Sequence, residues 1–359
     1  MKAMGIFDDM LRSDESLFAD AVNLDYDYLP KLIPYREHEQ KQIAASIKPL
    51  FSQRTGKNML VHGPPGVGKT AAVRHLFREL TESTDDVFPI YINTWQKNTT
   101  FKIIMEVCEQ LDYKFTHNKK TEELFAIIQN MLNKKAAVFC FDEVDKVEEL
   151  DFLYMILEQI YRKSIIMITN YREWAVNLDE RIKSRLNLEM LEFRKYSESE
   201  IQGILEERKR YAFVPGVWQE DAFRCAVKKT AELGDIRTGL YMLREAGNCA
   251  EERSSRKIEH KDVQAAIDKL SDLKVKKTTD LKDEDQMILM VIKDNSGEKI
   301  GDLFEKYKAQ GGTGVYKTFQ RKIEFLSKNK FISTMKQVGG SEGTTTIVKY
   351  ERETRLDEF

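Results

Sequence analysis

The chain has 359 residues, which is enough for two or three domains with a sizeable buried core. Its 42% hydrophobic and 32% charged residues are ordinary for a water-soluble globular protein, and a net charge of −2 excludes a chain that is polycationic throughout. No apolar run is long enough to span a membrane, no export signal is recognisable, and the scattered cysteines and histidines lack metal-ligand spacing, so we expect a cytoplasmic protein with no membrane partner.

The first 195 residues predict an α/β domain. Residues 1–35 are acidic and aromatic, which is typical of an extended lead-in, and a helix is expected over Arg36–Phe51. Continuous apolar runs predict strands at 58–62, 89–93, 136–141, 165–168 and 188–193. Because these runs do not alternate with polar residues, both faces of the sheet should be buried, as in parallel sheets. Strands that alternate with helices predict a three-layer domain.

Residues 63–70, GPPGVGKT, lie between the first predicted strand and a predicted helix over Thr70–Leu80. The pattern G-x-x-x-x-G-K-[ST] in this context is typical of a loop whose amides surround phosphate groups, reinforced by the helix N-terminus. Lys69 should reach the β- and γ-phosphates, and the Thr70 hydroxyl should contact Mg²⁺. A simple surface turn is the alternative. The residues expected around the nucleotide are Pro64, Pro65, Gly66, Val67, Gly68, Lys69, Thr70 and Ala71.

A second motif, AAVFCFDEVD at 136–145, is a buried strand that ends in acidic residues. Strand ends of a parallel sheet face the same crevice as the phosphate loop. We therefore expect Asp142 to hold Mg²⁺ and Glu143 to orient and deprotonate the attacking water, whereas Asp145 should cap a helix. Asn170, after the next strand, is placed to hold that water, although asparagine at a strand end is also a common turn residue.

Residues 178–185 carry Arg181 and Arg185 on a short segment. An exposed arginine there either enters a neighbouring subunit's site and stabilises transition-state charge or forms a surface salt bridge. A small all-α domain is expected over 196–275, beginning with a capping box at Ser197–Glu200. Arg237, at the start of one of its helices, is expected either to touch the γ-phosphate or to form a structural ion pair. The helices of this domain are expected at about 197–211, 218–232, 236–253 and 260–271, followed by a polar linker over Lys274–Thr279.

Residues 276–359 predict a winged helix. Helices are expected at 283–293, 299–309 and 315–329, and strands at 331–338 and 344–350. Between Lys299 and Tyr350 the chain has ten lysines and arginines and four acidic residues, a net charge of +6 that favours DNA binding over a protein-binding winged helix with a lysine-rich surface. Phe319, Ile323 and Leu326 should face the core. The candidate DNA contacts are Tyr316, Lys317, Gln320, Arg321, Lys336 and Thr345.

These motifs in this order resemble the AAA+ ATPases, and within them the archaeal origin-recognition and cell-division-control initiator family. The resemblance covers nearly the whole chain. Its more specific parts are the stretches at 23–37, 178–186 (LDERIKSRL), 204–217 (ILEERKRYAFVPGV) and 234–252 (GDIRTGLYMLREAGNCAEE). The resemblance implies an AAA+ parallel-sheet ATPase domain, a helical lid and a C-terminal winged helix that reads origin DNA.

By position, the resemblance implies that ATP or ADP with Mg²⁺ binds at Lys69, Thr70, Asp142 and Glu143. It also implies that Asn170 and Arg237 are the two sensor residues and that Arg185, or else Arg181, is the arginine finger offered in trans. Tyr35 and Arg36 would lie on the adenine side. The helical insert at about 94–111 would correspond to a DNA-contacting insert, although its segment Trp95–Thr100 has one basic residue only.

The preferred function is an ATP-regulated initiator that binds duplex origin DNA and helps recruit or load the replicative helicase. The resemblance further implies slow ATP hydrolysis that acts as a switch, and other initiator subunits as candidate partners. One alternative is a clamp-loader-type or motor AAA+ ATPase. Another is a nucleotide-locked regulator that binds DNA or protein and hardly hydrolyses. The presence of Glu143 and Asn170 disfavours this last alternative.

Overall fold

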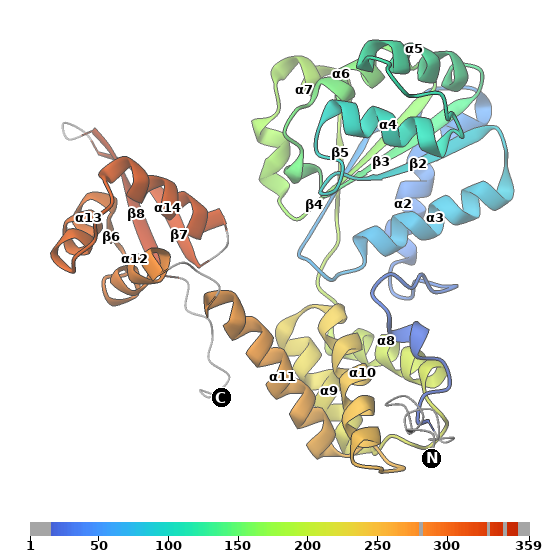
Figure 1. Ribbon diagram of the computed structural model, residues 1–359. Helices are drawn as coiled ribbons and strands as arrows, with labels where there is room; N and C mark the ends of the chain where they lie inside the picture. Colours follow the sequence, from blue (N-terminus) through green and yellow to red (C-terminus); the bar gives the residue numbers. More distant parts are fainter. Residues whose placement is uncertain (1–15, 280–282, 329–330, 340–342, 351–359) are drawn as a thin grey trace, which may run out of the picture. The chain divides into compact units, whose positions relative to one another are not determined.

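The computed structural model describes residues 16–279, 283–328, 331–339 and 343–350 (Figure 1). The chain divides into two compact units, Met1–Ala266 and Ile267–Phe359. Each unit has its own hydrophobic core and is described by itself.

The first unit contains a five-stranded sheet in the order β2-β3-β4-β1-β5. All neighbouring strands are parallel, which confirms the predicted parallel sheet. The strands are β1 Met59–His62, β2 Val87–Asn93, β3 Ala136–Asp142, β4 Lys163–Thr169 and β5 Glu189–Glu192. In this register His62 pairs with Thr169 and Asn93 pairs with Asp142, so the carboxyl ends of β1 to β4 lie at one edge of the sheet.

Helices cover both faces of this sheet (Figure 1). One face packs on α2 Glu37–Ile47 and α3 Lys69–Ser83. The opposite face packs on α4 Thr100–Gln110, α5 Thr121–Leu132, α6 Asp151–Gln159 and α7 Glu180–Leu186. Alternate residues of β1 to β4 contribute to the two cores, as on β3, where Phe139 faces α4 to α7 and Val138 faces α2 and α3. The three-layer prediction is therefore confirmed.

The predicted helix over Arg36–Phe51 is α2 followed by a 3-10 segment, Lys48–Ser52. The change coincides with Pro49, which has no N–H for a helical hydrogen bond. The strand β2 is at the sheet edge, where Pro89 is tolerated because an edge strand needs fewer backbone donors.

The rest of the first unit is helical, as predicted. Its helices are α8 Glu198–Ala212, α9 Glu220–Leu233, α10 Ile236–Glu252 and the first part of α11 His260–Thr279, which continues past Ala266 into the second unit. The capping box of Ser197 and Glu200 starts α8 as expected. The chain before α2 packs on these helices through a 3-10 turn, Ala21–Leu24, and through the rings of Phe18 and Phe213, whose centroids are 4.7 Å apart.

The structure corrects one prediction at the end of this region. The segment Lys274–Thr279, expected to be a polar linker, belongs to α11. Lysine is a good helix former, so a polar composition alone does not end a helix.

The second unit is a winged helix, as predicted. After the end of α11 it contains α12 Asp283–Asp294, β6 Glu298–Lys299, α13 Ile300–Ala309, α14 Tyr316–Lys328, β7 Ile332–Gly339 and β8 Gly343–Tyr350. The strands form an antiparallel sheet in the order β6-β8-β7. The two-residue strand β6 is too short for a sequence pattern and was not predicted. The core contains Ile288, Ile292, Leu303, Phe319 and Ile323.

Candidate functional site

The predicted phosphate loop connects β1 to α3 and is closely covered by other parts of the first unit. Gly66 and Gly68 have φ of 73° and 87°, in the left-handed region that favours glycine. A Cβ atom on Gly66 would lie 1.9 Å from Oδ1 of Asp235, and one on Gly68 would lie 2.7 Å from the Tyr196 hydroxyl. The loop therefore requires glycine for its conformation and for its close contacts.

Lys69 lies inside this loop with only 7% of its surface exposed. Its ammonium donates to the carbonyl oxygens of Gly63 and Pro64, at 2.7 and 2.8 Å, and to Oδ1 of Asn170 at 2.8 Å. Burial lowers the pKa of Lys69 to about 8, against the opposing effect of Asp142 and Glu143. The structure thus brings Asn170 next to Lys69, as predicted for two residues of one phosphate site.

Asp142, at the end of β3, is 3% exposed and lies beside Thr70. Its Oδ2 accepts hydrogen bonds from the Thr70 hydroxyl at 2.7 Å and from the Tyr91 hydroxyl at 2.6 Å. Its Oδ1 accepts the backbone N–H of Glu143 at 2.9 Å. A hydroxyl and a carboxylate side by side are hard oxygen donors, which fit Mg²⁺ held mainly by phosphates, water and one or two protein groups. Burial and the adjacent carboxylate raise the pKa of Tyr91, so its hydroxyl stays a donor.

Glu143 follows in a left-handed backbone conformation, with φ of 58°, and precedes a 3-10 turn, Val144–Lys146. Burial and the charges of Asp142 and Asp145 raise the pKa of Glu143. A raised pKa suits a carboxylate that accepts a proton from water. The expected helix-capping role of Asp145 is wrong, because Asp145 lies inside the turn, accepts a hydrogen bond from Thr169 at 2.9 Å and pairs with Lys146.

Arg237 lies at the start of α10, beside the phosphate loop. Its guanidinium pairs with Asp235 at 3.1 Å, and its side chain is 52% exposed. The backbone N–H of Ile236 donates to the carbonyl oxygen of Gly66 at 3.3 Å, so this end of α10 touches the loop directly. The positive charge of Arg237 also contributes to the lowered pKa of Lys69. Arg237, which is predicted to be a sensor residue, therefore lies near the phosphate site and pairs with Asp235, the N-cap residue of α10.

The two finger candidates lie on α7. Arg185 pairs with Glu158 and lies over the ring of Tyr154, 5.3 Å from its centroid. Arg181 is exposed on the same helix. A role in a neighbouring subunit's site stays a prediction for both residues.

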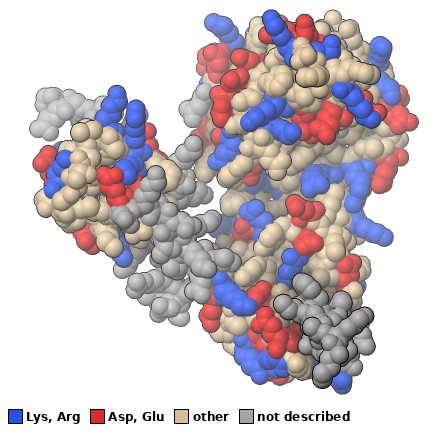
Figure 2. Space-filling view, in the orientation of Figure 1, with Lys and Arg blue, Asp and Glu red and all other residues tan. Residues whose placement is uncertain are grey.

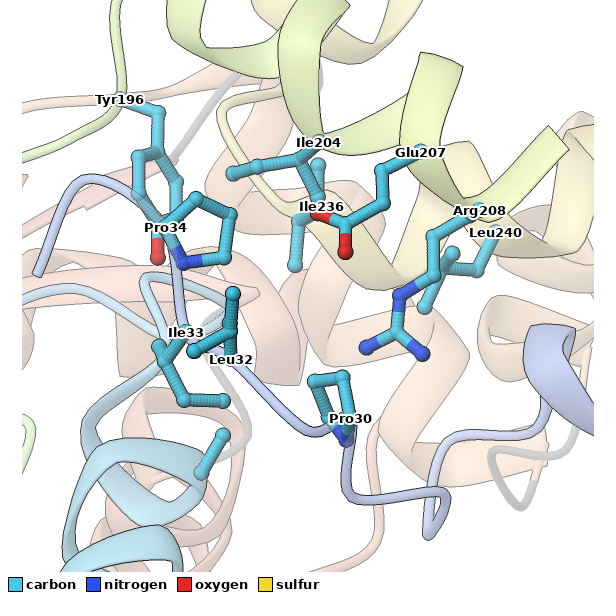
Figure 3. Close-up of a pocket in the computed structure, with 12 residues that line it drawn as sticks. Pro30, Leu32, Ile33, Pro34, Tyr196, Ile204, Glu207, Arg208, Ile236 and Leu240 are labelled. Carbon is cyan, nitrogen blue, oxygen red and sulfur yellow. The ribbon is translucent and has the colours of Figure 1, made fainter. Parts of the chain in front are cut away.

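A small apolar cavity adjoins the phosphate loop (Figure 3). It lies between the segment before α2, the start of α3, and helices α8 and α10, with Glu207 and Arg208 at one side. Its apolar walls fit the flat base of a nucleotide. The lining residues are Pro30, Leu32, Ile33, Pro34, Gly68, Ala71, Tyr196, Ile204, Glu207, Arg208, Ile236 and Leu240. The contributions of Ile204, Ile236 and Leu240 were not predicted, although Ile236 and Leu240 form an i, i+4 apolar pair directly after a helix cap.

Tyr35 and Arg36 are predicted on the adenine side, and Arg36 contacts the phosphate loop directly. Arg36 is fully buried and donates to the carbonyl oxygens of Val67 and Arg194, at 3.0 and 2.5 Å. Its guanidinium also stacks on Tyr196, 4.0 Å from the ring centroid. A Cβ atom on Gly203 would lie 2.1 Å from the Tyr35 hydroxyl. Direct nucleotide contact stays a prediction for Tyr35 and Arg36.

The insert predicted at about 94–111 contains α4. Its one basic residue before the helix, Lys97, pairs with Glu106 at 3.0 Å. Trp95 is 65% exposed, with the Lys146 ammonium 5.3 Å from its ring centroid. DNA contact by this segment stays a prediction.

In the winged helix, α14 has the two faces that were predicted. Phe319, Ile323 and Leu326 are buried, whereas Lys317, Gln320 and Arg321 are exposed. Tyr316 is 39% exposed and its ring packs edge-on against Phe304. Lys336 and Thr345 lie on β7 and β8, outside the residues whose side chains the structure describes.

Two of the lysines counted as a positive surface are paired within the winged helix. Lys322 pairs with Asp285 at 2.6 Å and with Glu284 at 3.1 Å, and Lys306 pairs with Glu298 at 2.6 Å. On the face shown in Figure 2, basic and acidic side chains are interspersed. The charge free to meet DNA phosphates is therefore smaller than the sequence count.

Within the described ranges, no helix combines the length and apolar character needed to cross a lipid bilayer.

The chain matches two family models, an AAA domain over residues 53–171 and a Cdc6 AAA+ ATPase-type lid domain over residues 202–268. It is 30% identical to ORC1-type DNA replication protein 3 of Haloarcula marismortui, with 89% of each chain covered. It is 28% identical to ORC1-type DNA replication protein 2 of Methanosarcina acetivorans, with 97% of this chain and 98% of the relative covered. The solved structure of the Aeropyrum pernix ORC1 protein in complex with DNA matches with a TM-score of 0.75 and 26% identity, over 94% of this chain and 95% of that one.

Proposed function

The chain belongs to the family of ORC1-type DNA replication proteins, and we propose that it is an ATP-regulated initiator that binds duplex origin DNA and helps recruit or load the replicative helicase. ATP hydrolysis would be slow and would act as a switch, and other initiator subunits would supply neighbouring sites. The nucleotide-binding domain would extend to about residue 195, the lid to about residue 275, and the DNA-binding domain to the end of the chain.

The observation that carries this proposal is the hydrogen-bonded set at the carboxyl edge of the sheet. Lys69 bonds to Asn170, and Thr70 bonds to Asp142, so the loop and the ends of β3 and β4 meet at one place. Phosphoryl transfer requires mainly positioning and charge neutralisation, which this set supplies. The ammonium of Lys69 would exchange two backbone carbonyls for phosphate oxygens of ATP.

Thr70 and Asp142 would hold Mg²⁺, which when bound would neutralise charge on the phosphate oxygens. Glu143 would take the proton of the attacking water, and Asn170 would orient that water. Arg237 would leave Asp235 for the γ-phosphate, because a phosphate carries more negative charge than one carboxylate. This exchange would couple the nucleotide to the position of α10, and ADP would leave Arg237 with Asp235.

DNA binding would use the exposed face of α14, with Lys317 and Arg321 on phosphates and Gln320 on base edges. The hairpin would add Lys336 and Thr345. The matched complex of a relative with DNA supports the choice of DNA as the partner.

The test compares wild type with Lys69→Ala. Removing the ammonium deletes charge-assisted hydrogen bonds of roughly 1.5–3 kcal/mol each, so ATP affinity should fall about 100-fold. Footprinting of wild type on genomic DNA should show discrete protected sites. ATP should change the protection of these sites in wild type and should have no effect on it in Lys69→Ala. Lys57→Ala is the matched control, because Lys57 forms an exposed pair with Glu189 at 2.6 Å. Unchanged ATP affinity in Lys69→Ala, or protection indifferent to sequence, would overturn the proposal.

A further inference from the structure

Tyr91 lies on the edge strand β2 and reaches toward the magnesium-binding carboxylate from the neighbouring strand. It pairs with Cys140 in the sheet register, and both residues belong to the core that faces α3. Asp142 is two residues beyond Cys140, so its side chain lies on the same face. This geometry places a phenol, a carboxylate and the start of α3 on one side of the sheet.

The Asp142 carboxylate is held at both oxygens. The hydroxyls of Tyr91 and Thr70 both donate to Oδ2, at 2.6 and 2.7 Å, and the N–H of Glu143 donates to Oδ1 at 2.9 Å. Thr70 is the other proposed magnesium ligand, so its hydroxyl must reorient when the ion binds. The Tyr91 hydroxyl is not a proposed magnesium ligand, so it can keep its hydrogen bond to Asp142 before and after the ion binds.

Tyr91 is itself fixed in position. Although β2 is an edge strand, the side-chain amide of Gln110 satisfies both backbone groups of Tyr91, with distances of 3.1 Å from its N–H and 2.7 Å to its carbonyl oxygen. Gln110 is held in turn by Glu106 at 2.8 Å. The guanidinium of Arg74, one turn after Thr70 on α3, lies 5.7 Å from the centre of the Tyr91 ring. These neighbours therefore fix the Tyr91 side chain in a position from which its hydroxyl donates to Asp142.

We propose that Tyr91 is a positioning residue of the magnesium site, whose hydroxyl fixes the orientation of the Asp142 carboxylate for the ion that accompanies the nucleotide. This inference rests on the proposed function of the same site. Groups that hydrogen-bond to metal ligands commonly change metal affinity by about 10–100-fold when they are removed. A packing role alone would need only the ring, which phenylalanine also provides.

The experiment measures nucleotide affinity of the full-length protein in EDTA and during a Mg²⁺ titration, for wild type and Tyr91→Phe. We expect the half-effective Mg²⁺ concentration to rise about tenfold or more in the variant, with affinity in EDTA unchanged. Tyr113→Phe is the matched control, because Tyr113 is a half-buried tyrosine packed against the other core. An unchanged Mg²⁺ requirement overturns the inference, and so does an equal loss with and without Mg²⁺, which would indicate a structural role.

A double variant tests whether Tyr91 affects the Mg²⁺ requirement through Asp142. In Asp142→Asn, the added change Tyr91→Phe should shift the Mg²⁺ requirement no further, because the group that Tyr91 orients is already altered. A further shift of full size in that background would show that Tyr91 acts elsewhere. If wild type itself bound no nucleotide, the proposed function would fail, which is a different result from a silent Tyr91→Phe.

Discussion

The candidate nucleotide site and the exposed face of α14 are built in different ways. In the nucleotide site the functional groups bond to one another inside the protein, as Lys69 does with Asn170 and Thr70 with Asp142. On α14 the residues predicted to meet DNA, such as Lys317 and Arg321, are exposed to solvent. The first region depends on a few prearranged contacts, so single changes there should have large effects. The second depends on a sum of surface contacts, so single changes should have small effects.

The largest effect is expected for Glu143→Gln in the nucleotide site. Loss of a general base should lower single-turnover ATP hydrolysis by about 10²–10⁴-fold, while ATP affinity stays within a few-fold of wild type. The exposed Glu149→Gln, on the loop after the same strand, is the control and should hydrolyse normally. If wild type and Glu143→Gln bind ATP and are equally inert, the protein is a nucleotide-locked regulator instead of a slow ATPase.

A smaller effect is expected for Thr94→Val, which keeps the side-chain shape and removes one hydroxyl. Thr94 is fully buried, and its hydroxyl lies 2.7 Å from the carbonyl oxygens of both Asp142 and Glu143. Without this donor the left-handed backbone of Glu143 should relax, and we expect hydrolysis to fall about tenfold with about 1 kcal/mol of stability lost. Single-turnover ATP hydrolysis measures the change in rate, and urea unfolding measures the change in stability.

Thr230→Val is the matched control for Thr94→Val. Thr230 is also fully buried, and its hydroxyl donates to the carbonyl oxygen of Ala226 at 2.7 Å within α9. The Thr230→Val variant should lose about as much free energy of unfolding as Thr94→Val and should hydrolyse ATP at the wild-type rate. Equal losses of rate in both variants would mean that Thr94 acts only through general stability.

The sequence predicts which residues of the candidate nucleotide site lie together, because the main parts of that site are local. A glycine-rich loop between strand and helix, and acidic residues at a strand end, place Lys69, Thr70, Asp142 and Glu143 through the order of elements alone. The contacts of Tyr91 and Thr94 with these residues depend on the register between β2 and β3, which no local pattern encodes. The complete burial of Arg36 likewise depends on segments far apart in the chain.

In the winged helix, the sequence predicts the buried core better than it predicts the charge available at the surface. The buried face of α14 follows from the spacing of Phe319, Ile323 and Leu326, and the structure confirms it. The charge count was less informative, because it could not tell which lysines pair with carboxylates on other elements. Lys306 and Lys322 contribute to the sequence count and yet form ion pairs within the fold.

On α14, Arg321→Ala should weaken DNA binding by about five- to tenfold. It should also reduce the slope of log affinity against log salt by about one, because one phosphate contact is lost. Fluorescence anisotropy with duplex DNA at several salt concentrations measures both quantities. Arg224→Ala is the control, since Arg224 is an exposed arginine on α9 that pairs with Glu220. An unchanged salt slope in Arg321→Ala would contradict a phosphate contact at this face.

The smallest effect on DNA is expected for the adjacent residue, in Lys322→Met. Lys322 bonds to Asp285 and Glu284, so its loss should leave the salt slope unchanged and should cost about 1 kcal/mol of local stability. Hydrogen exchange of α12 and α14, corrected for the intrinsic rate at each pH, measures that loss in the full-length protein. A reduced salt slope with unchanged exchange would show that Lys322 meets DNA, and the contrast with Arg321 would disappear.

The same pair predicts a pH dependence. The Tyr307 hydroxyl and then the Lys322 ammonium hold the pKa of Glu284 below its usual value. A carboxylate with a lowered pKa in the folded state stabilises the fold above its ordinary pKa near 4.5, and this contribution disappears as the pH falls further. The stability difference between wild type and Lys322→Met should therefore be full at pH 7 and shrink below about pH 4.5. A difference that stays constant across this range would mean that the Lys322 stem stabilises α14 by packing, and that its charge contributes nothing.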